Sequence, residues 1–306
     1  MRALIVGGLG FVGSYIADAL LRAGAFVQIV DLGIRGRPYQ QKLLPYTSLR
    51  RIEEEALNLC WGKAWDVIFH CASPVGILGI LRFHGKIVAD MVSATEAVLS
   101  IKTDKLVYIS SSDVYSLSGG YAEGAPLDGH VGGYPRDEYR VGKIACETMV
   151  SAAMQREKRG AVIVRPFNLV GGRQCADKGF VVSRFFTALR LAQPIEVFYD
   201  GNQERAFCDV RDFVDGLFVL LNQNANGTYN VGNPANQISI LELAYLCQRI
   251  AGVDTEIRMV NPNQLYPQFQ EGSPKLPAIE KMTTLGWSPK IGLEAALKAV
   301  WESDDL

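Results

Sequence analysis

Tyr139 and Lys143 stand four residues apart in the segment Tyr-Arg-Val-Gly-Lys, so on a helix their side chains share one face. An ammonium beside a phenol favours the phenolate, because an opposite charge stabilises the ionised form. A phenol that accepts a proton near pH 7 needs its pKa lowered by about 3 units, or roughly 4 kcal/mol. A lysine and a bound cationic cofactor ring could together supply this. The spacing is also typical of a solvated surface pair, so its chemistry depends on what other segments bring to the same place.

A glycine-rich turn near the N-terminus is one such segment. The apolar run 2–6 predicts a buried strand, and helical periodicity covers residues 14–23. Between them stand Gly7, Gly10 and Gly13. Glycines let the backbone approach a pyrophosphate, and the helix N-terminus offers that anion free N–H groups and a positive dipole end. The arrangement is typical of a dinucleotide site.

An acidic residue completes this unit. A second strand over 26–30 ends at Asp31, whose carboxylate can accept hydrogen bonds from an adenosine ribose. The same charge repels a 2′-phosphate, which favours NAD over NADP as the cofactor. Arg35 and Arg37 nearby weaken that preference.

Three further strands are expected over 66–70, 106–109 and 161–164. In a parallel sheet their carboxyl ends meet at one edge, where open α/β sheets bind ligands. The segments expected at that edge are Cys71-Ala72-Ser73, whose small residues let backbone lie against a cofactor, Ser110-Ser111-Ser112-Asp113 and Arg165-Pro-Phe-Asn168. A serine cluster is equally typical of a helix cap or a turn.

The remaining segments divide into helix and loop. Residues 86–101 and about 138–157 show helical periodicity, whereas 75–84 are expected to form a loop. Residues 32–64 are expected to be loop and exposed helix. His70 falls inside a strand, and we expect it to be a core histidine rather than a catalytic one.

Composition excludes several classes of function. The 306 residues exceed one ~150-residue core and fit a large α/β unit with a smaller lobe. The net charge of −1 shows no footprint for nucleic acid or an acidic membrane surface, and no run of 18 apolar residues predicts a membrane span. The six widely spaced cysteines indicate reduced thiols in a cytoplasmic protein, and neither they nor the histidines have metal-ligand spacing. The N-terminus lacks the features of a signal peptide.

Together the motifs resemble the extended short-chain dehydrogenase/reductases, in their NAD-dependent nucleotide-sugar epimerase/dehydratase family. Those that carry the resemblance are Gly7-x-x-Gly10-x-x-Gly13, Asp31, Ser110-Ser-Ser-Asp-Val-Tyr, Tyr139-x-x-x-Lys143, Arg165-Pro-Phe-Asn168, Asp200 to Asp212, Gly227 to Gly232 and Leu285-Gly-Trp-Ser-Pro289. The resemblance implies a Rossmann-type doubly wound parallel sheet with a smaller C-terminal α/β substrate-binding lobe. It gives an NAD-binding domain of 1–170 plus about 205–232, and a nucleotide-sugar-binding lobe of about 171–204 plus 233–306.

The resemblance also implies roles for single residues. Tyr139 would transfer the proton, Lys143 would lower the pKa of Tyr139 and bind the nicotinamide ribose, and Ser111 would hydrogen-bond the reacting hydroxyl. The substrate residues expected are Ser112, Asn168 near the nucleotide phosphates, Arg205 on the diphosphate, and Lys275, which stands where the family has a second basic residue. The cofactor residues expected are Gly7, Gly10, Phe11, Val12, Gly13, Asp31, Cys71, Ala72 and Ser73, with Tyr139 and Lys143.

Residues 112 and 113 bear on what becomes of the oxidised sugar. In dehydratases of this family the two positions are Asp then Glu, which act as acid and base, and a decarboxylase has Ser then Glu. Here Ser112 and Asp113 leave one carboxylate, and Asp113 is equally typical of a turn cap. We expect a nucleotide-sugar 4-epimerase that works through a transient 4-keto sugar. The alternatives are a dehydratase or decarboxylase that uses Asp113 as a further base, and a non-catalytic dinucleotide sensor.

The partners expected follow from the same resemblance. They are NAD, a nucleotide-diphosphate sugar and a second copy of the chain, because helices such as those over 86–101 and 138–157 pair into a four-helix homodimer interface in relatives. Neither a metal, nor nucleic acid, nor a membrane is expected.

Overall fold

The computed structural model describes residues 1–33, 37–55, 64–116, 121–157, 159–266, 269 and 275–305. Within them, parallel strands form a seven-stranded sheet in the order β11-β6-β5-β4-β1-β2-β3. The strands are β1 Arg2–Val6, β2 Phe26–Asp31, β3 Thr47–Leu49, β4 Trp65–His70, β5 Thr103–Ile109, β6 Gly160–Pro166 and β11 Gly227–Val231. The predicted doubly wound parallel sheet is confirmed. Its edge strand β3 lies where we expected loop and helix.

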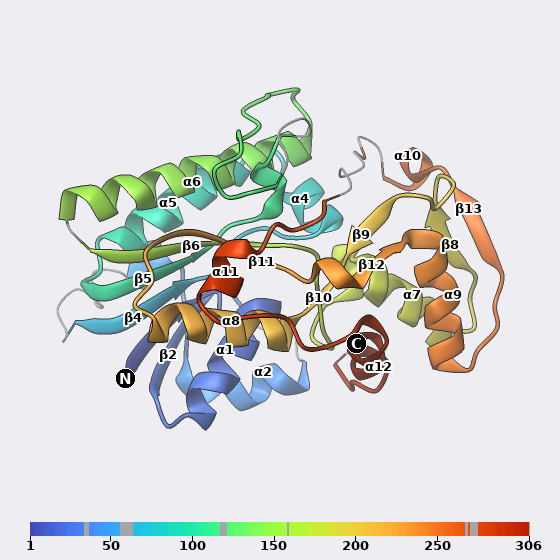
Figure 1. The fold of residues 1–306 in the computed structure, drawn as a ribbon, viewed down its shortest axis with the longest axis horizontal. Helices are drawn as coiled ribbons and strands as arrows, with labels where there is room; N and C mark the ends of the chain where they lie inside the picture. The colour runs from blue at the N-terminus through green and yellow to red at the C-terminus, as the bar shows by residue number, and fades with distance from the viewer. Residues whose placement is uncertain are drawn as a thin grey trace.

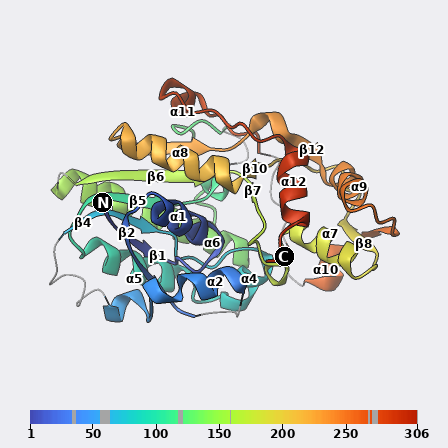
Figure 2. The ribbon, with the colours of Figure 1, turned by 90° about the horizontal axis from the view of Figure 1, so that it is seen from below.

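Helices cover both faces of this sheet (Figures 1 and 2). Neighbouring residues of a strand point to opposite faces, so Leu4 and Ile5 of β1 belong to different cores. On the Leu4 side pack α5 Ile87–Leu99 and the long helix α6 Pro135–Glu157. On the Ile5 side pack α1 Phe11–Arg22, α2 Pro38–Leu43 and α8 Val210–Asn222. The homodimer expected through α5 and α6 stays a prediction.

A smaller α/β lobe lies at the carboxyl-end side of the sheet, on the right in Figure 1. Its strands pair as β7 Leu169–Val170 with β10 Cys208–Asp209, β8 Ile195–Phe198 with β13 Ile257–Val260, and β9 Glu204–Ala206 with β12 Gln237–Ser239. Its helices are α7 Val181–Arg190, α9 Ile240–Ala251, α10 Pro262–Leu265 and α12 Leu293–Trp301. Helices α7, α9 and α12 share one apolar core with β8.

The predicted residue-by-residue division between domain and lobe stays a prediction. One short segment that the division assigns to the lobe packs instead against the sheet domain. Met282 of α11 Glu280–Thr284 and Trp287 lie in the core beneath α8, on the sheet side of the molecule. Trp287 also donates from Nε1 to the Asp212 carbonyl at 3.2 Å.

Residues 75–84 are not the loop that the sequence suggested. They form helix α4 Ile77–Phe83, preceded by Gly76 with a φ of 72°. Gly76 is needed there for close approach, because a Cβ would collide with the backbone carbonyl of Lys178. Gly79 lies buried inside the helix against the Lys178 side chain. The two glycines therefore permit a tertiary contact between α4 and the segment around Lys178.

Candidate active site

The glycine turn forms a backbone cradle above the sheet. Gly7 has a φ of 83°, and a Cβ on it would lie 2.7 Å from the Ala72 backbone nitrogen. Gly10 begins α1 with no side-chain cap, which leaves the first N–H groups of the helix available to an anion. Cys71 and Ala72, predicted at the cofactor, therefore lie directly against the turn. A cradle that any side chain would fill, at a helix N-terminus, suits the pyrophosphate of a dinucleotide.

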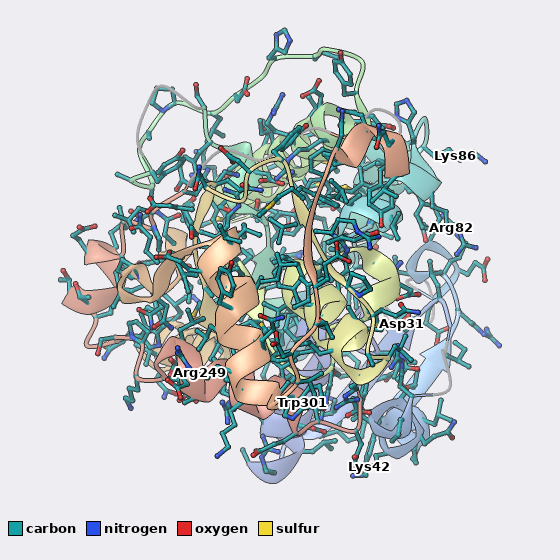
Figure 3. The ribbon with its side chains drawn as sticks, turned by 90° about the vertical axis from the view of Figure 1, so that its right-hand side faces the viewer. Asp31, Lys42, Arg82, Lys86, Arg249 and Trp301 are labelled. Atoms are coloured by element: carbon teal, nitrogen blue, oxygen red, sulfur yellow. The ribbon has the colours of Figure 1, made fainter. Side chains whose placement is uncertain are left out.

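Asp31 lies beside this turn at the end of β2. Its carboxylate accepts a hydrogen bond from the Leu9 N–H at 2.8 Å, which fixes the acid close to the glycines. Arg37 donates to the Asp305 carbonyl at 3.2 Å, so its guanidinium is engaged with the C-terminal segment. Arg35 lies outside the described residues. In Figure 3, Asp31 lies on the same half of the molecule as Arg82 and Lys86, and Arg249 of the lobe lies on the other.

The predicted pair on α6 meets the serine turn at the carboxyl end of β5. Ser111 follows β5 and caps the short 3₁₀ turn Ser112–Val114, accepting from the Asp113 N–H at 3.1 Å. The hydroxyls of Ser111 and Ser73 lie near enough to the Tyr139 phenol to lower its pKa. Lys143 donates to the Ile109 carbonyl at 2.8 Å, and its Nζ lies 5.8 Å from the centre of the Tyr139 ring. Residues from three parts of the chain thus converge on one phenol.

The direction of the Tyr139 pKa differs from the expectation. Burial raises the pKa of Tyr139 above its usual value, and the nearby Asp113 carboxylate raises it further. The Ser111 and Ser73 hydroxyls act in the opposite sense and are outweighed. Lys143 does not reverse this, because it is itself buried and its ammonium is directed to Ile109. A lowered Tyr139 pKa therefore needs a further positive charge beside the phenol.

The surroundings of Lys143 make its ammonium costly to keep charged. Burial lowers the pKa of Lys143 to about 8. His70 lies in the same buried layer, with Nε2 3.0 Å from the Thr95 hydroxyl. Burial lowers the pKa of His70 to about 3, so this imidazole is neutral. The prediction of a core histidine is confirmed by its 1% exposure.

A buried ion pair holds α6 to the serine turn. Glu147 lies one turn beyond Lys143 on the same face of α6 and pairs with Arg165 through two hydrogen bonds of 2.9 and 2.5 Å. The same carboxylate accepts from the Ser110 hydroxyl at 2.5 Å. Because Ser110 precedes Ser111, this network fixes the serine turn relative to Tyr139 and Lys143.

Asp113 is held between two cations. Arg136 donates through one Nη to both carboxylate oxygens, at 3.0 and 3.1 Å, and Lys275 donates to Oδ1. Burial alone would raise the pKa of Asp113, but Arg136 and Lys275 outweigh it and hold the pKa well below its usual range. The carboxylate is therefore ionised, and a weak proton acceptor. Sequence reasoning did not single out Arg136, although it stands three residues before Tyr139 on the same helical face.

The other expected substrate residues lie along the border of sheet and lobe. Asn168 follows β6 in a left-handed conformation, with a φ of 35°, and its amide donates to the Ala206 carbonyl at 3.1 Å. Arg205 stands next to Ala206 on β9 and is near enough to lower the pKa of Lys275. Lys275 itself lies at Asp113, beside the serine turn. Ser112 is buried.

Phe11 and Val12 lie in the first turn of α1. The Phe11 ring is near enough to Gly171 that a Cβ there would lie 2.9 Å from it. Val12 packs against the core below the sheet. Among the described helices, none is both long and apolar enough to cross a membrane.

The glycine turn at the N-terminus of α1 and the Tyr139–Lys143 pair with Ser111 thus lie at the carboxyl edge of one Rossmann-like sheet. A family model, the NAD dependent epimerase/dehydratase family, matches residues 3–232. The chain belongs to this family, and its cofactor is NAD.

Curated relatives of the chain include UDP-glucuronic acid decarboxylases. One from Xenopus tropicalis is 32% identical over 302 residues, covering 97% of this chain and 70% of the relative. Another, UDP-glucuronic acid decarboxylase 6 of Arabidopsis thaliana, is 28% identical, covering 99% and 88%.

Solved structures of similar fold include epimerases. A UDP-glucuronic acid 4-epimerase mutant from Bacillus cereus, in complex with UDP-4-deoxy-4-fluoro-glucuronic acid and NAD, has a TM-score of 0.83 at 25% identity, covering 99% of this chain and 98% of the other. Pal from Bacillus thuringiensis has a TM-score of 0.85 at 25% identity, with the same coverage. The chain is therefore an enzyme of the NAD-dependent nucleotide-sugar epimerase, decarboxylase and dehydratase group.

Proposed function

We propose that this protein is a nucleotide-sugar 4-epimerase that works through a transient 4-keto sugar. The observation that carries the proposal is the pairing of a complete Tyr139–Lys143–Ser111 centre with an Asp113 that is locked between two cations. The first group suits oxidation of a hydroxyl. The second leaves Asp113 poorly suited to remove a proton from the resulting ketone.

The oxidation assigns one task to each residue. Tyr139 accepts the proton of the C4 hydroxyl, and Ser111, whose hydroxyl lies near the same phenol, orients that hydroxyl. Lys143 holds a positive charge under the site and contacts the nicotinamide ribose. Bound NAD⁺ supplies the hydride acceptor, and its cationic ring adds the positive charge that a lowered Tyr139 pKa requires. Gly7, Gly10, Gly13 and Asp31 hold the cofactor.

Epimerisation makes fewer demands on the protein than the alternatives. The keto sugar presents its other face and takes the hydride back, so Tyr139 returns the proton it accepted and no further base is needed. Dehydration requires loss of the proton at C5 to a base. Asp113 has a strongly lowered pKa and two ion-pair partners, so it accepts a proton poorly.

Decarboxylation is the second candidate, and a specific observation favours it. The Xenopus tropicalis relative, named a UDP-glucuronic acid decarboxylase, is 32% identical over 97% of this chain. A 4-keto sugar with a carboxylate on C5 is a β-keto acid, which loses carbon dioxide without a protein base. Both candidates therefore share the C4 oxidation and differ only in what the site permits afterwards.

The test is a panel of UDP-, GDP-, CDP- and dTDP-sugars, incubated with the enzyme and NAD⁺ and analysed by NMR for products. Interconversion of C4 epimers supports the proposal, whereas release of carbon dioxide or water would replace it with a lyase. NAD binding without turnover of any sugar would indicate a dinucleotide sensor.

Tyr139→Phe should abolish turnover. Tyr115→Phe, which removes another buried phenolic hydroxyl, bonded to Asn230 at 2.6 Å, is the matched control and should keep it. Equal activity of the two variants would contradict the assignment of Tyr139.

A further inference from the structure

Leu9, in the middle of the glycine turn, has both of its backbone polar groups fixed. Its N–H donates to the Asp31 carboxylate at 2.8 Å. Its carbonyl accepts from the Tyr39 hydroxyl at 3.2 Å and from the Gln40 side-chain amide at 3.0 Å. Tyr39 and Gln40 belong to α2 and are buried. The position of the backbone that suits a pyrophosphate therefore depends on the position of this helix.

The helix α2 is itself held from outside. It has six residues, and a helix of that length depends on contacts with the rest of the protein. The segment that follows α12 supplies such contacts at its first turn. The Tyr39 N–H donates to Asp305 Oδ1 at 3.4 Å, and the Arg37 guanidinium donates to the Asp305 carbonyl at 3.2 Å. A carboxylate at the start of a helix is also stabilised by the helix dipole.

Arg173 joins this contact to the helix that begins in the glycine turn. Its guanidinium lies over the rings of Tyr15 and Tyr39, 4.5 and 4.9 Å from their centres. Its Nη2 donates to the carboxylate of Asp18, and its Nε lies 4.0 Å from the carboxylate of Asp305. Tyr15 and Asp18 both stand on α1. One side chain therefore links α1, α2 and Asp305.

The segment that carries Asp305 comes from the lobe. Helix α12, which precedes it, packs in the apolar core of the lobe. The carbonyls of Trp301 and Ser303 accept from Arg190 of α7 at 2.7 and 2.8 Å, and the Ser303 hydroxyl donates to the Gly172 carbonyl at 3.3 Å. Residues 301–305 are thus fixed at the lobe at one end and at α2 at the other.

We propose that Asp305, Arg173 and Tyr39 form a brace that positions the glycine turn for NAD, so that the segment after α12 determines how tightly the cofactor is held. The three act through the Leu9 backbone and α1 rather than on reacting atoms, and are therefore positioning residues. A turn that is already held in its binding conformation loses less freedom when the cofactor binds. The brace concerns the cofactor alone and does not depend on which sugar reacts.

The experiment measures the NAD dissociation constant of the cofactor-free full chain by fluorescence titration. Tyr39→Phe removes one hydrogen bond to the turn and should weaken NAD binding about three- to tenfold. Asp305→Asn removes the charge at the far end of the brace and should weaken it about threefold. The double variant should lose less than the product of the two single effects, because both act on the same turn.

Hydrogen exchange separates this role from a general loss of stability. In both single variants the amides of residues 7–13 should exchange faster, whereas those of β5 should exchange at the wild-type rate, since local opening leaves a central strand protected. Asp304→Asn and Tyr46→Phe are the matched controls, since Asp304 is an exposed neighbour of Asp305 and Tyr46 is a 40% exposed tyrosine just after α2. Both should keep the wild-type NAD affinity.

Wild-type NAD affinity in both Tyr39→Phe and Asp305→Asn would overturn the inference. So would faster exchange that is spread equally over the glycine turn and β5, because the two side chains would then support the fold as a whole. Single effects that multiply in the double variant would show that Asp305 and Tyr39 act separately, which also contradicts a brace.

Discussion

Asp113→Asn separates the two roles open to Asp113, a counter-ion or a catalytic base. Removing one partner of a fully buried ion pair costs about 3–5 kcal/mol, and exposed pairs contribute at most about 1 kcal/mol. The side chain of Asp113 is 18% exposed, and those of Arg136 and Lys275 are 27% and 7% exposed. These ion pairs are therefore intermediate between fully buried and exposed pairs. We expect a loss of about 2 kcal/mol, and roughly 2 °C in Tm per kcal/mol gives a Tm about 4 °C lower.

The stability effect has a defined pH dependence. Arg136 and Lys275 hold the pKa of Asp113 below its unfolded value, so its contribution is present above about pH 4 and disappears as the pH falls further. The difference in Tm between wild type and Asp113→Asn should therefore close on acidification. Asp128→Asn is the matched control, since Asp128 is 21% exposed and its carboxylate pairs with Arg140 at 3.3 Å instead of with Arg136 or Lys275.

Turnover distinguishes the two roles of Asp113. A counter-ion predicts that Asp113→Asn lowers the rate of C4 oxidation by less than tenfold. Loss of a general base costs about 10²- to 10⁴-fold. The assay is NADH absorbance and NMR of the product at saturating substrate. A fall of more than a hundredfold in a variant that is folded and binds NAD would refute the counter-ion role.

Three further predictions concern the cofactor side of the site. Keeping Lys143 charged at pH 7 costs about 3 kcal/mol because its pKa is lowered to about 8. Lys143→Met gives up its hydrogen bond to Ile109, about 1 kcal/mol. The Lys143→Met variant should therefore have a higher Tm than the wild type at pH 7 and should no longer oxidise C4. As the pH rises from 8 towards 10.5, the difference in Tm should disappear, which thermal melts would measure. The pKa of His70 is about 3 in the folded protein and about 6.5 in the unfolded chain, so the free energy of unfolding decreases as the pH is lowered from 6.5 to 3. Between pH 7 and pH 4, His70→Phe should lose about 3 kcal/mol less of this free energy than the wild type does. The same decrease in both proteins would count against this prediction. Asp31→Ser should weaken NAD binding about tenfold through its lost hydrogen bonds and admit NADP, in fluorescence titrations with both cofactors.

The sequence predicted features that local spacing determines. The glycines at 7, 10 and 13, the acid at the end of the second strand and the Tyr–Lys pair all depend on residues close in the chain. Their strands are continuous apolar runs, as expected for a sheet buried on both faces. The fold class and the segments at the carboxyl edge of the sheet followed from them.

Long-range features escaped prediction. Arg136 and Lys275 are 23 and 162 residues from Asp113, and no local pattern indicates that they meet. The predicted direction of the Tyr139 pKa shift was wrong for a related reason. The sequence shows that Lys143 is close to Tyr139 but does not show that Tyr139 is buried. Gly76 suggested a loop over 75–84. It is instead needed for close contact with Lys178, which is too far away in the chain to be foreseen from local sequence.

The central claim is that the enzyme oxidises C4 and returns the same hydride. UDP-glucuronic acid deuterated at C4 tests it directly, with the product analysed by NMR and mass spectrometry in ordinary water. The account predicts the C4 epimer with all six sugar carbons and with deuterium retained at C4, lost entirely in Tyr139→Phe. A five-carbon product, or an epimer that has exchanged its C4 deuterium with solvent, would contradict it.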